Sequence, residues 1–371
     1  MANPKKPPFR ADHVGSLLRP RSLRTARDAL SKGAFSREAL REVEDRAIRD
    51  AVRMQESVGL QSITDGEFRR AIWHVDFLTG FAGIEATQSD YAIGFRGDDG
   101  RSEGTASMMV VKEKVRRLRA IALDHFRFLY SITARTPKQC IPSPTFLHLR
   151  GGRKLIDPIV YPDPAVFWED IIHAYRLEIA DLMEAGLTYL QLDDVSFAVL
   201  CDEAVRAQVR ADGEDPDALP KRYVDIINRI AAEWPGLTIT LHTCRGNHKS
   251  MWMASGGYDA VAETVFGGAN VDGFFLEYDT ERAGGFEPLR FVAPGKKVVL
   301  GLVSTKRAQL ESKDELKRRI EEASKYVPLE RLCLSPQCGF ASSHFGNQLT
   351  EDDQKRKLAL VVETANEVWG Q

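Results

Sequence analysis

The chain has 371 residues, of which 43% are hydrophobic and 28% charged, and this balance predicts a folded globular protein with a large core. Because 51 basic and 53 acidic residues leave a formal charge of −2, the sequence lacks the cationic character of nucleic-acid-binding proteins. No apolar run reaches the roughly 18 residues of a membrane span, and the N-terminal stretch resembles neither a signal peptide nor an anchor. Five cysteines, an odd number, favour free thiols, so we expect a cytoplasmic protein that acts on small molecules.

Short apolar or β-branched runs alternate along the chain with longer segments of helical periodicity, which is typical of repeated β-α units on a parallel sheet. The predicted strands are residues 11–16, 60–67, 140–148, 187–194, 237–244, 271–278, 296–305 and 331–339. Helices are predicted within 36–59, over 163–185, in stretches through 233, near 254–268 and over 358–370. Eight such units in a chain of this length predict a single closed (β/α)8 barrel, or TIM barrel, over residues 1–371.

Residues 80–135 interrupt this alternation between the second and third predicted strands. The region has alternating runs of its own, such as SMMVVKEKV at 107–115 and FRFLYSITA at 126–134. A connection of this length usually carries its own structure or function. The pattern therefore predicts an inserted element, rich in β-hairpins, that lies beside the site.

Polar side chains gather at the predicted C-terminal ends of the strands. They are Ser16, Asp65, Glu67, Asp193, Asp194, His242, Cys244, Glu277, Ser304 and Cys338. In a (β/α)8 barrel this end carries the catalytic residues, and polar residues scattered at random would not favour one end of every strand. The placement therefore indicates an enzyme.

The stretch LTITLHTCRGN at 237–247 places His242 and Cys244 two residues apart at the end of a strand, so both side chains project from the same face. Glu277 ends the sixth predicted strand and Cys338 the eighth, which gathers four donor groups onto one arc of the rim. Two thiolates, an imidazole and a carboxylate suit zinc. The long separations between the donors indicate a site assembled by the fold rather than a zinc finger.

Each donor also has an ordinary structural explanation. His242 beside Cys244 can be a core histidine next to a buried free thiol. Glu277 can form a salt bridge at the rim with Arg245 or Arg282. The remaining cysteines, which we predict to be structural, are Cys140, Cys201 and Cys333.

Zinc that carries two thiolates is a weak Lewis acid for hydrolysis, but it still lowers the pKa of an incoming thiol and holds it as a thiolate near neutral pH. Because the thiolate is the nucleophile in alkyl transfer, the donor set predicts S-alkylation rather than attack by water. Catalytic zinc usually keeps one coordination position open, so four protein donors would require a fifth ligand or the movement of one donor.

Seven stretches carry a resemblance to a known family. They are HVGSLLRP (13–20), TDGEFRR (64–70), YLQLDD (189–194), LHTCRGN (241–247), FFLEYD (274–279), VVLGLVSTK (298–306) and LSPQCGF (334–340). In these stretches the chain resembles the cobalamin-independent methionine synthase family, and more narrowly its short, single-barrel members. The resemblance implies a methyltransferase that moves a methyl group from a folate-like donor, 5-methyltetrahydrofolate or an analogue, to the thiol of homocysteine, giving methionine.

The resemblance also implies roles for individual residues. Zinc would be held by His242, Cys244, Glu277 and Cys338. The amino-acid end of homocysteine would be bound by Gly15, Ser16, Glu67 and Asp193. This agrees with simple chemistry, because an ammonium group prefers carboxylates and a carboxylate prefers hydroxyl and N–H donors. The alternative for the two acidic residues is ion pairing at the rim with Arg69, Arg70 or Arg245.

The methyl donor is the open part of this prediction. Long members of the family carry a second, N-terminal barrel that helps to hold a polyglutamylated folate, and 371 residues leave no room for it. Candidates for stacking on a pterin are Trp73, Phe77, Phe146, Trp168 and Phe197, and candidates for binding its anionic tail are Arg69, Arg70, Arg96, Arg101 and Lys306. Candidates for a general acid are Asp193, Asp194, His13 and His344. His13 equally suits a structural hydrogen bond.

Two other functions stay open. The same zinc-thiolate chemistry would serve alkyl transfer or demethylation with a different thiol, or with a small methylated or epoxide donor. A protein that binds zinc or thiols without catalysis is the alternative outside enzymes, since a fold does not settle a function. A homodimer stays open as the oligomeric state.

Overall fold

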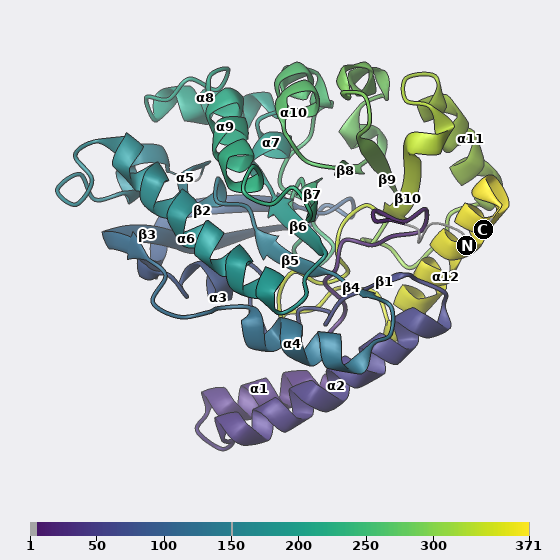
Figure 1. The fold of residues 1–371 in the computed structure, drawn as a ribbon, viewed down its shortest axis with the longest axis horizontal. Helices are drawn as coiled ribbons and strands as arrows, with labels where there is room; N and C mark the ends of the chain where they lie inside the picture. The colour runs from purple at the N-terminus through teal and green to yellow at the C-terminus, as the bar shows by residue number, and fades with distance from the viewer. Residues whose placement is uncertain (1–5, 150, 371) are drawn as a thin grey trace.

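The computed structural model describes residues 6–149 and 151–370 of the chain, without the side chains of residues 88–93 and 105–107. Its centre is a six-stranded parallel sheet in the order β10-β9-β8-β7-β6-β5 (Figure 1). The labelled strands that build the barrel are β1 (Ser62–Ile63), β4 (Thr136–Pro137), β5 (Gln139–Pro142), β6 (Tyr189–Asp194), β7 (Thr238–Thr243), β8 (Gly273–Glu277), β9 (Lys297–Val303) and β10 (Leu332–Pro336), of which β4 and β5 together form one barrel strand. The six main strands are almost entirely buried, as expected of parallel strands covered on both faces.

Short segments at both edges continue this sheet into a closed barrel. β1 pairs in parallel with β4, which leads directly into β5. At the other edge Ala11 forms a parallel bridge to β10, and Asp12 N donates to Leu334 O at 3.0 Å. The two edges meet where Thr64 Oγ1 donates to Gly15 O at 2.6 Å. The predicted (β/α)8 barrel is confirmed, with its first two strands reduced to short pieces.

The first three strands are shorter than the sequence predicts. The chain leaves extended geometry at Gly15, Gly66 and Glu67, which all have positive φ, so little of 11–16 and 60–67 forms regular ladders. The third predicted strand, 140–148, ends at Pro142, and α5 (Phe146–Leu149) follows. Proline has no N–H to donate, which limits how far a ladder can continue.

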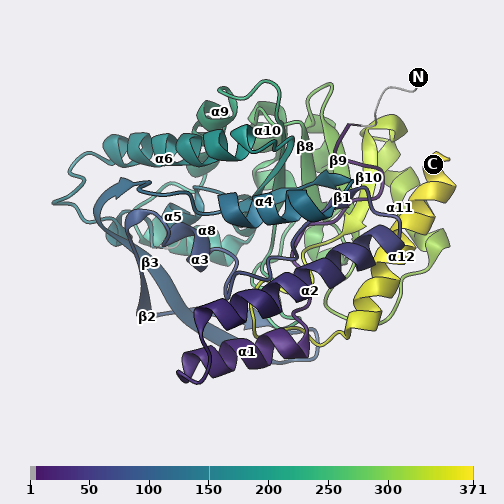
Figure 2. The ribbon, with the colours of Figure 1, turned by 60° about the horizontal axis from the view of Figure 1, so that its bottom comes forward.

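Helices pack around the outer side of the sheet, as the two ribbon views show (Figures 1 and 2). They are α1 (Arg21–Ser31), α2 (Arg37–Ser57), α6 (Pro164–Glu184), α8 (Glu203–Ala211), α9 (Leu219–Ala231), α10 (Ala262–Gly268), α11 (Lys313–Ser324) and α12 (Glu351–Trp369). Ser36 caps α2 by accepting from Ala39 N at 3.1 Å. The helix predicted near 254–268 is α-helical only from Ala262. Gly256 at φ +125° lies outside helical geometry, and residues Tyr258–Ala260 form a short 3-10 turn.

One long hairpin dominates the insertion between the second and third strands. β2 (Ala82–Arg96) and β3 (Ser102–Arg116), of 15 residues each, pair antiparallel around the turn at 97–101. The inserted hairpin is confirmed, but the extended structure expected of FRFLYSITA is wrong, because that run lies mainly in α4 (Leu123–Ile132). Phe126 and Leu129 are three residues apart and both buried, so the apolar residues of the run form one face of a helix.

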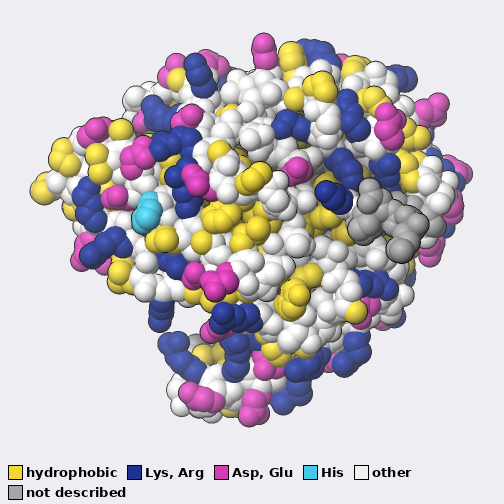
Figure 3. All heavy atoms as spheres, in the orientation of Figure 1, with side chains coloured by type: hydrophobic (Ala, Val, Ile, Leu, Met, Phe, Trp, Pro, Cys, Tyr) yellow, Lys and Arg dark blue, Asp and Glu magenta, His cyan; other side chains and the backbone are white. Residues whose placement is uncertain are grey.

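The surface carries charges of both signs. On the face shown in Figure 3, basic and acidic side chains are interspersed, without an extended field of one sign. This agrees with the formal charge of −2. Every helix in the described ranges is too short or too polar to span a membrane.

Candidate metal centre and its cavity

A cavity of about 380 Å³ lies at the C-terminal ends of the barrel strands. Its wall includes Ser16, Glu67, Asp193, Asp194, His242, Cys244 and Cys338. The strand register accounts for part of this grouping, because Asp193 of β6 lies beside His242 of β7. Residues predicted separately at the ends of distant strands therefore share one cavity, at the end of the barrel where such folds carry active sites.

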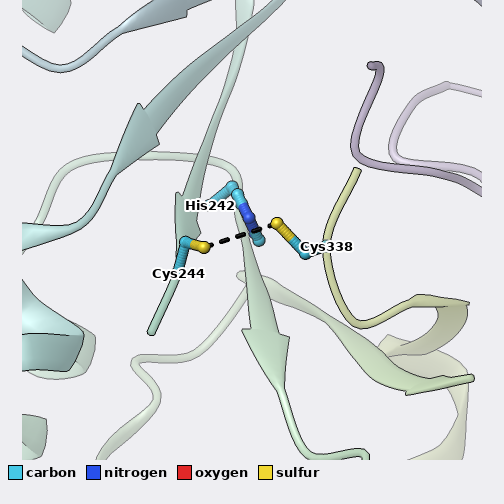
Figure 4. Close-up of side chains that lie close together, drawn as sticks. All are labelled: His242, Cys244 and Cys338. Atoms are coloured by element: carbon cyan, nitrogen blue, oxygen red, sulfur yellow. Dashed lines mark hydrogen bonds between the residues drawn. The ribbon is translucent and has the colours of Figure 1, made fainter. Parts of the chain in front are cut away.

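Three of the predicted metal ligands lie together in this wall. The ligand atoms of His242, Cys244 and Cys338 all lie within 4.8 Å of one another, and the two sulfurs are 3.3 Å apart. Figure 4 shows the three side chains converging, two from the end of β7 and one from the segment after β10. All three are buried. Neither ring nitrogen of His242 has a hydrogen-bond partner among the residues that the structure describes.

This unpaired imidazole is the observation that tests whether a metal fits. A buried polar group without a hydrogen bond is costly, since it has left water without a replacement contact. A metal ion bound to one ring nitrogen would remove part of that cost. The two sulfurs beside it complete a set of donors that zinc binds well, so the residues present fit a zinc ion.

The two sulfurs of this group are arranged to share a proton. The hydrogen bond from Cys338 lowers the pKa of Cys244 to about 5. The same contact raises the pKa of Cys338 well above its usual value. One sulfur therefore carries negative charge at neutral pH, and a thiolate is the form in which cysteine binds metals.

The fourth predicted ligand, Glu277, is engaged elsewhere in the structure. It ends β8 and is fully buried, as expected, but its carboxylate is not part of the group within 4.8 Å. Its Oε1 accepts from Arg282 at 2.6 Å and its Oε2 accepts from Arg245 N at 2.9 Å. The contact with Arg282 is the salt bridge that the sequence suggests as the alternative role of Glu277.

The two carboxylates predicted to bind the substrate ammonium both lie in the cavity wall. Burial raises the pKa of Asp193 to about 7, although Gln191 Nε2 donates to its Oδ1 at 2.6 Å. Burial also raises the pKa of Glu67, although Arg70 lies 3.2 Å from its Oε1. The other oxygen of Glu67, Oε2, is buried and has no partner in the described part of the chain. A positively charged ligand group would stabilise the ionised form of both residues.

The turn that presents Ser16 requires a glycine before it. Gly15 has φ +131°, and a Cβ at this position would lie only 2.6 Å from Cys140 Sγ. Ser16 is part of the cavity wall, whereas Gly15 is not. Gly15 therefore sets the course of the backbone in this turn, and Ser16 presents its side chain at the cavity.

The candidates for a general acid differ in their access to the cavity. His13 is buried outside the wall with Nε2 3.1 Å from Ser62 O, and burial lowers its pKa to about 4. His344 also lies outside the wall, with Nδ1 3.2 Å from Ala71 O. Asp194 lies in the wall and accepts from Phe197 N at 2.9 Å. Asp193 is the candidate that combines a place in the wall with a pKa near neutrality.

Few of the residues suggested for donor binding reach the cavity. Among the five aromatic candidates, the wall includes Trp73, and Phe146 packs against that ring at 5.4 Å. Phe77, Trp168 and Phe197 belong to the hydrophobic core. The described wall includes none of the cationic candidates, which are Arg69, Arg70, Arg96, Arg101 and Lys306.

The inserted hairpin contributes wall residues that the sequence did not reveal. Phe95 and Glu103 come from β2 and β3, and His248 comes from the loop after β7. Arg96 N donates to Trp252 O at 2.7 Å, so the hairpin is bound to that loop. Glu103 strengthens the contact by accepting from Lys249 at 2.6 Å. The turn GDDG at 97–100 marks the tip of the predicted hairpin, but no sequence signal links it to a loop some 145 residues away.

Comparisons with known proteins agree with this geometry. The family model described as the catalytic domain of the cobalamin-independent synthase matches residues 9–367. The uncharacterized protein YxjG of Bacillus subtilis is 46% identical over 368 residues, which are 98% of this chain and 96% of that protein. The 5-methyltetrahydropteroyltriglutamate–homocysteine methyltransferase of Vibrio harveyi is 22% identical over 341 residues, which are 90% of this chain but 40% of that protein.

Two solved structures share the fold. A structure from Listeria monocytogenes, assigned as a vitamin-B12 independent methionine synthase, is 36% identical with a TM-score of 0.76, and the match covers 99% of this chain and 100% of that one. A B12-independent methionine synthase from Shewanella sp. W3-18-1 is 20% identical with a TM-score of 0.73, and the match covers 97% of each chain. The chain therefore belongs to the cobalamin-independent methionine synthase family.

Proposed function

We propose that this protein is a zinc-dependent methyltransferase that methylates the thiol of homocysteine and so forms methionine. The observation that carries the proposal is the buried, unpaired imidazole of His242 beside two sulfurs 3.3 Å apart, in the wall of the cavity. Membership of a family of methionine synthases supports homocysteine as the thiol.

Zinc would be held by His242, Cys244 and Cys338, with Glu277 as the candidate for a fourth ligand. When bound, the ion would lower the pKa of the substrate thiol, so that a thiolate is present at neutral pH. Glu277 already carries two hydrogen bonds, and a place on the metal would require it to give up at least part of its contact with Arg282. That exchange suits the expectation that one ligand position changes when substrate enters.

The other wall residues would orient the substrate. The unpaired Oε2 of Glu67 and the carboxylate of Asp193 would bind the ammonium group of homocysteine, and the Ser16 hydroxyl would donate to its carboxylate. With both charged ends fixed, the thiol would be free to reach the metal that the two sulfurs and the imidazole would hold. Such alignment contributes to rate because the reacting atoms no longer have to find each other.

The identity of the methyl donor is the part of the sequence prediction with least support. The name of the Vibrio harveyi relative specifies a donor with three glutamates. Glutamate carboxylates call for Arg or Lys, and the described wall of the cavity includes neither. A folate donor would therefore have to keep its tail outside the cavity.

Paired cysteine variants test the proposal. We expect Cys338→Ala to lose zinc and to reduce methionine formation at least about 100-fold, since even residues that only support metal ligands cost 10- to 100-fold. Cys333→Ala is the matched control, because Cys333 is also buried but lies in β10 and belongs to an apolar cluster. Metal analysis and methionine formation from homocysteine with several methyl donors would be measured for both. Equal zinc content in the two variants contradicts the metal site, and zinc binding without any methyl transfer would indicate a binding protein.

A further inference from the structure

The wall of the cavity has an unusual balance of charge for a protein that would bind an anionic cosubstrate. It includes the carboxylates of Glu67, Glu103, Asp193 and Asp194, and among the described residues no Lys or Arg. Glu67 and Asp193 would bind the ammonium group of homocysteine, which leaves Glu103 and Asp194 as the carboxylates that face a second ligand. Cations approach the wall from behind it: Arg70 contacts Glu67 Oε1 at 3.2 Å, Lys249 contacts Glu103 at 2.6 Å, and buried Lys306 donates to Gly246 O at 3.3 Å.

Aromatic rings make up much of the remaining wall. Trp73, Phe95 and Phe345 line the same cavity, together with the imidazoles of His74 and His248. Aromatic faces attract cations, and quaternary ammonium ligands are commonly held in cages of such rings. The protein itself shows this pairing at the rim, where the Lys249 ammonium lies 5.3 Å from the centroid of the Phe345 ring and binds Glu103.

The size of the cavity also limits the donor. A volume of about 380 Å³ lies near the lower end of the range for ligand pockets, which is about 300–1,000 Å³. The same cavity would have to contain homocysteine. A small donor fits beside it, whereas a pterin with its glutamates would extend beyond the cavity.

We propose that the methyl donor of this protein is a small methylsulfonium compound rather than a folate. This inference rests on the proposed function, because it concerns the second substrate of the same site. The positively charged sulfur would lie against the rings of Trp73 and Phe95, in the field of the wall carboxylates.

The reaction balances without a further reactant. The thiolate sulfur of homocysteine attacks the methyl carbon and forms a new carbon–sulfur bond. The bond between that carbon and the sulfonium sulfur breaks, and its electron pair returns to the leaving sulfur, which departs as a neutral thioether. No proton is transferred to the leaving group, so the burial of His13 and the position of His344 outside the wall are no obstacle.

A donor comparison tests this inference. Zinc-loaded protein would be given deuterated homocysteine with trimethylsulfonium, S-methylmethionine, or 5-methyltetrahydrofolate carrying one or three glutamates, and deuterated methionine would be measured by mass. We expect kcat/KM to be at least about tenfold higher for one of the sulfonium probes than for either folate. Methylation by folate alone would overturn the donor inference and leave the proposed function standing. Methylation by none of the four probes, with zinc and homocysteine bound, would also overturn the donor inference. Failure to bind zinc or homocysteine would overturn the proposed function itself.

Variants of Phe95 test the role of the ring. Phe95→Leu keeps an apolar side chain in the cluster with Met108 and Met251, so the hairpin should keep its fold. We expect this variant to lose about five- to tenfold in kcat/KM for the sulfonium probe, which corresponds to one cation–π contact. Phe95→Tyr should recover part of that loss because it restores an aromatic face. Equal values for the two variants would overturn the assignment of Phe95 to the donor.

Discussion

Replacement of Gly15 by alanine tests how closely the turn before Ser16 fits the barrel. At φ +131° a residue with a side chain is strained, which costs roughly 1–3 kcal/mol. The new Cβ would also lie 2.6 Å from Cys140 Sγ, and overpacking of this kind costs roughly 1–3 kcal/mol. We expect a loss of about 3 kcal/mol in unfolding free energy. For a chain of 371 residues this lowers the melting temperature by about 4 °C, since the unfolding entropy is about 2 cal/mol/K per residue.

Calorimetry or thermal circular dichroism would measure this shift, and two further variants separate its causes. Gly33→Ala is the matched control, because Gly33 has φ +71° but nothing lies within 4 Å of the Cβ that alanine would add, so only backbone strain applies. In a Cys140→Ala background the overpacking disappears, and Gly15→Ala should become roughly 1–3 kcal/mol less costly. A Gly15→Ala protein as stable as the wild type would contradict both sources of strain, and a loss that does not depend on Cys140 would exclude the overpacking.

Two further predictions concern the hairpin and the acid stability. Glu103→Gln removes the charge that binds Lys249 and His248, so amide hydrogen exchange at residues 94–104 should become faster, by less than about tenfold because the pair is partly exposed. Unchanged protection would contradict a role of the Glu103 charge, and would show that the backbone bridge to Trp252 is sufficient to hold the hairpin in place. Burial lowers the pKa of His148 to about 4, so the unfolded chain takes up that proton first and stability falls as the pH decreases from 6.5 to 4. His148→Gln should reduce this slope by up to about 1.4 kcal/mol per pH unit in denaturant titrations, and an unaltered slope would contradict the assignment.

The sequence predicted those parts of the site that depend on local spacing. His242 and Cys244 share a face because side chains alternate along β7, and Cys338 follows the last strand, so the barrel brings all three together. The sequence left two roles open for Glu277, as a metal ligand or as a partner in a salt bridge. Only the structure shows that Arg282 contacts its carboxylate. The residues that close the cavity were not predictable, because the contact of Glu103 with Lys249 joins segments 146 residues apart.

The limits of the fold prediction have similar causes. The spacing of apolar residues in FRFLYSITA suits a helix as well as a strand. The run forms α4 because Phe126 and Leu129 can both pack in the interior from one helix face. The first predicted strand carries Asp12, which is fully buried and accepts hydrogen bonds from Ser62 and Lys138. These side-chain contacts replace much of a regular ladder between the first two strands, and a pattern of apolar residues does not reveal them.

Zinc K-edge X-ray absorption of the purified protein, with and without homocysteine, would decide whether the cavity holds a metal that takes up the substrate thiol. We expect a zinc ion with two sulfur neighbours and at least one imidazole, and a third sulfur neighbour after homocysteine is added. A zinc environment without sulfur, or one that homocysteine leaves unchanged, would contradict the proposal that the metal activates the substrate thiol.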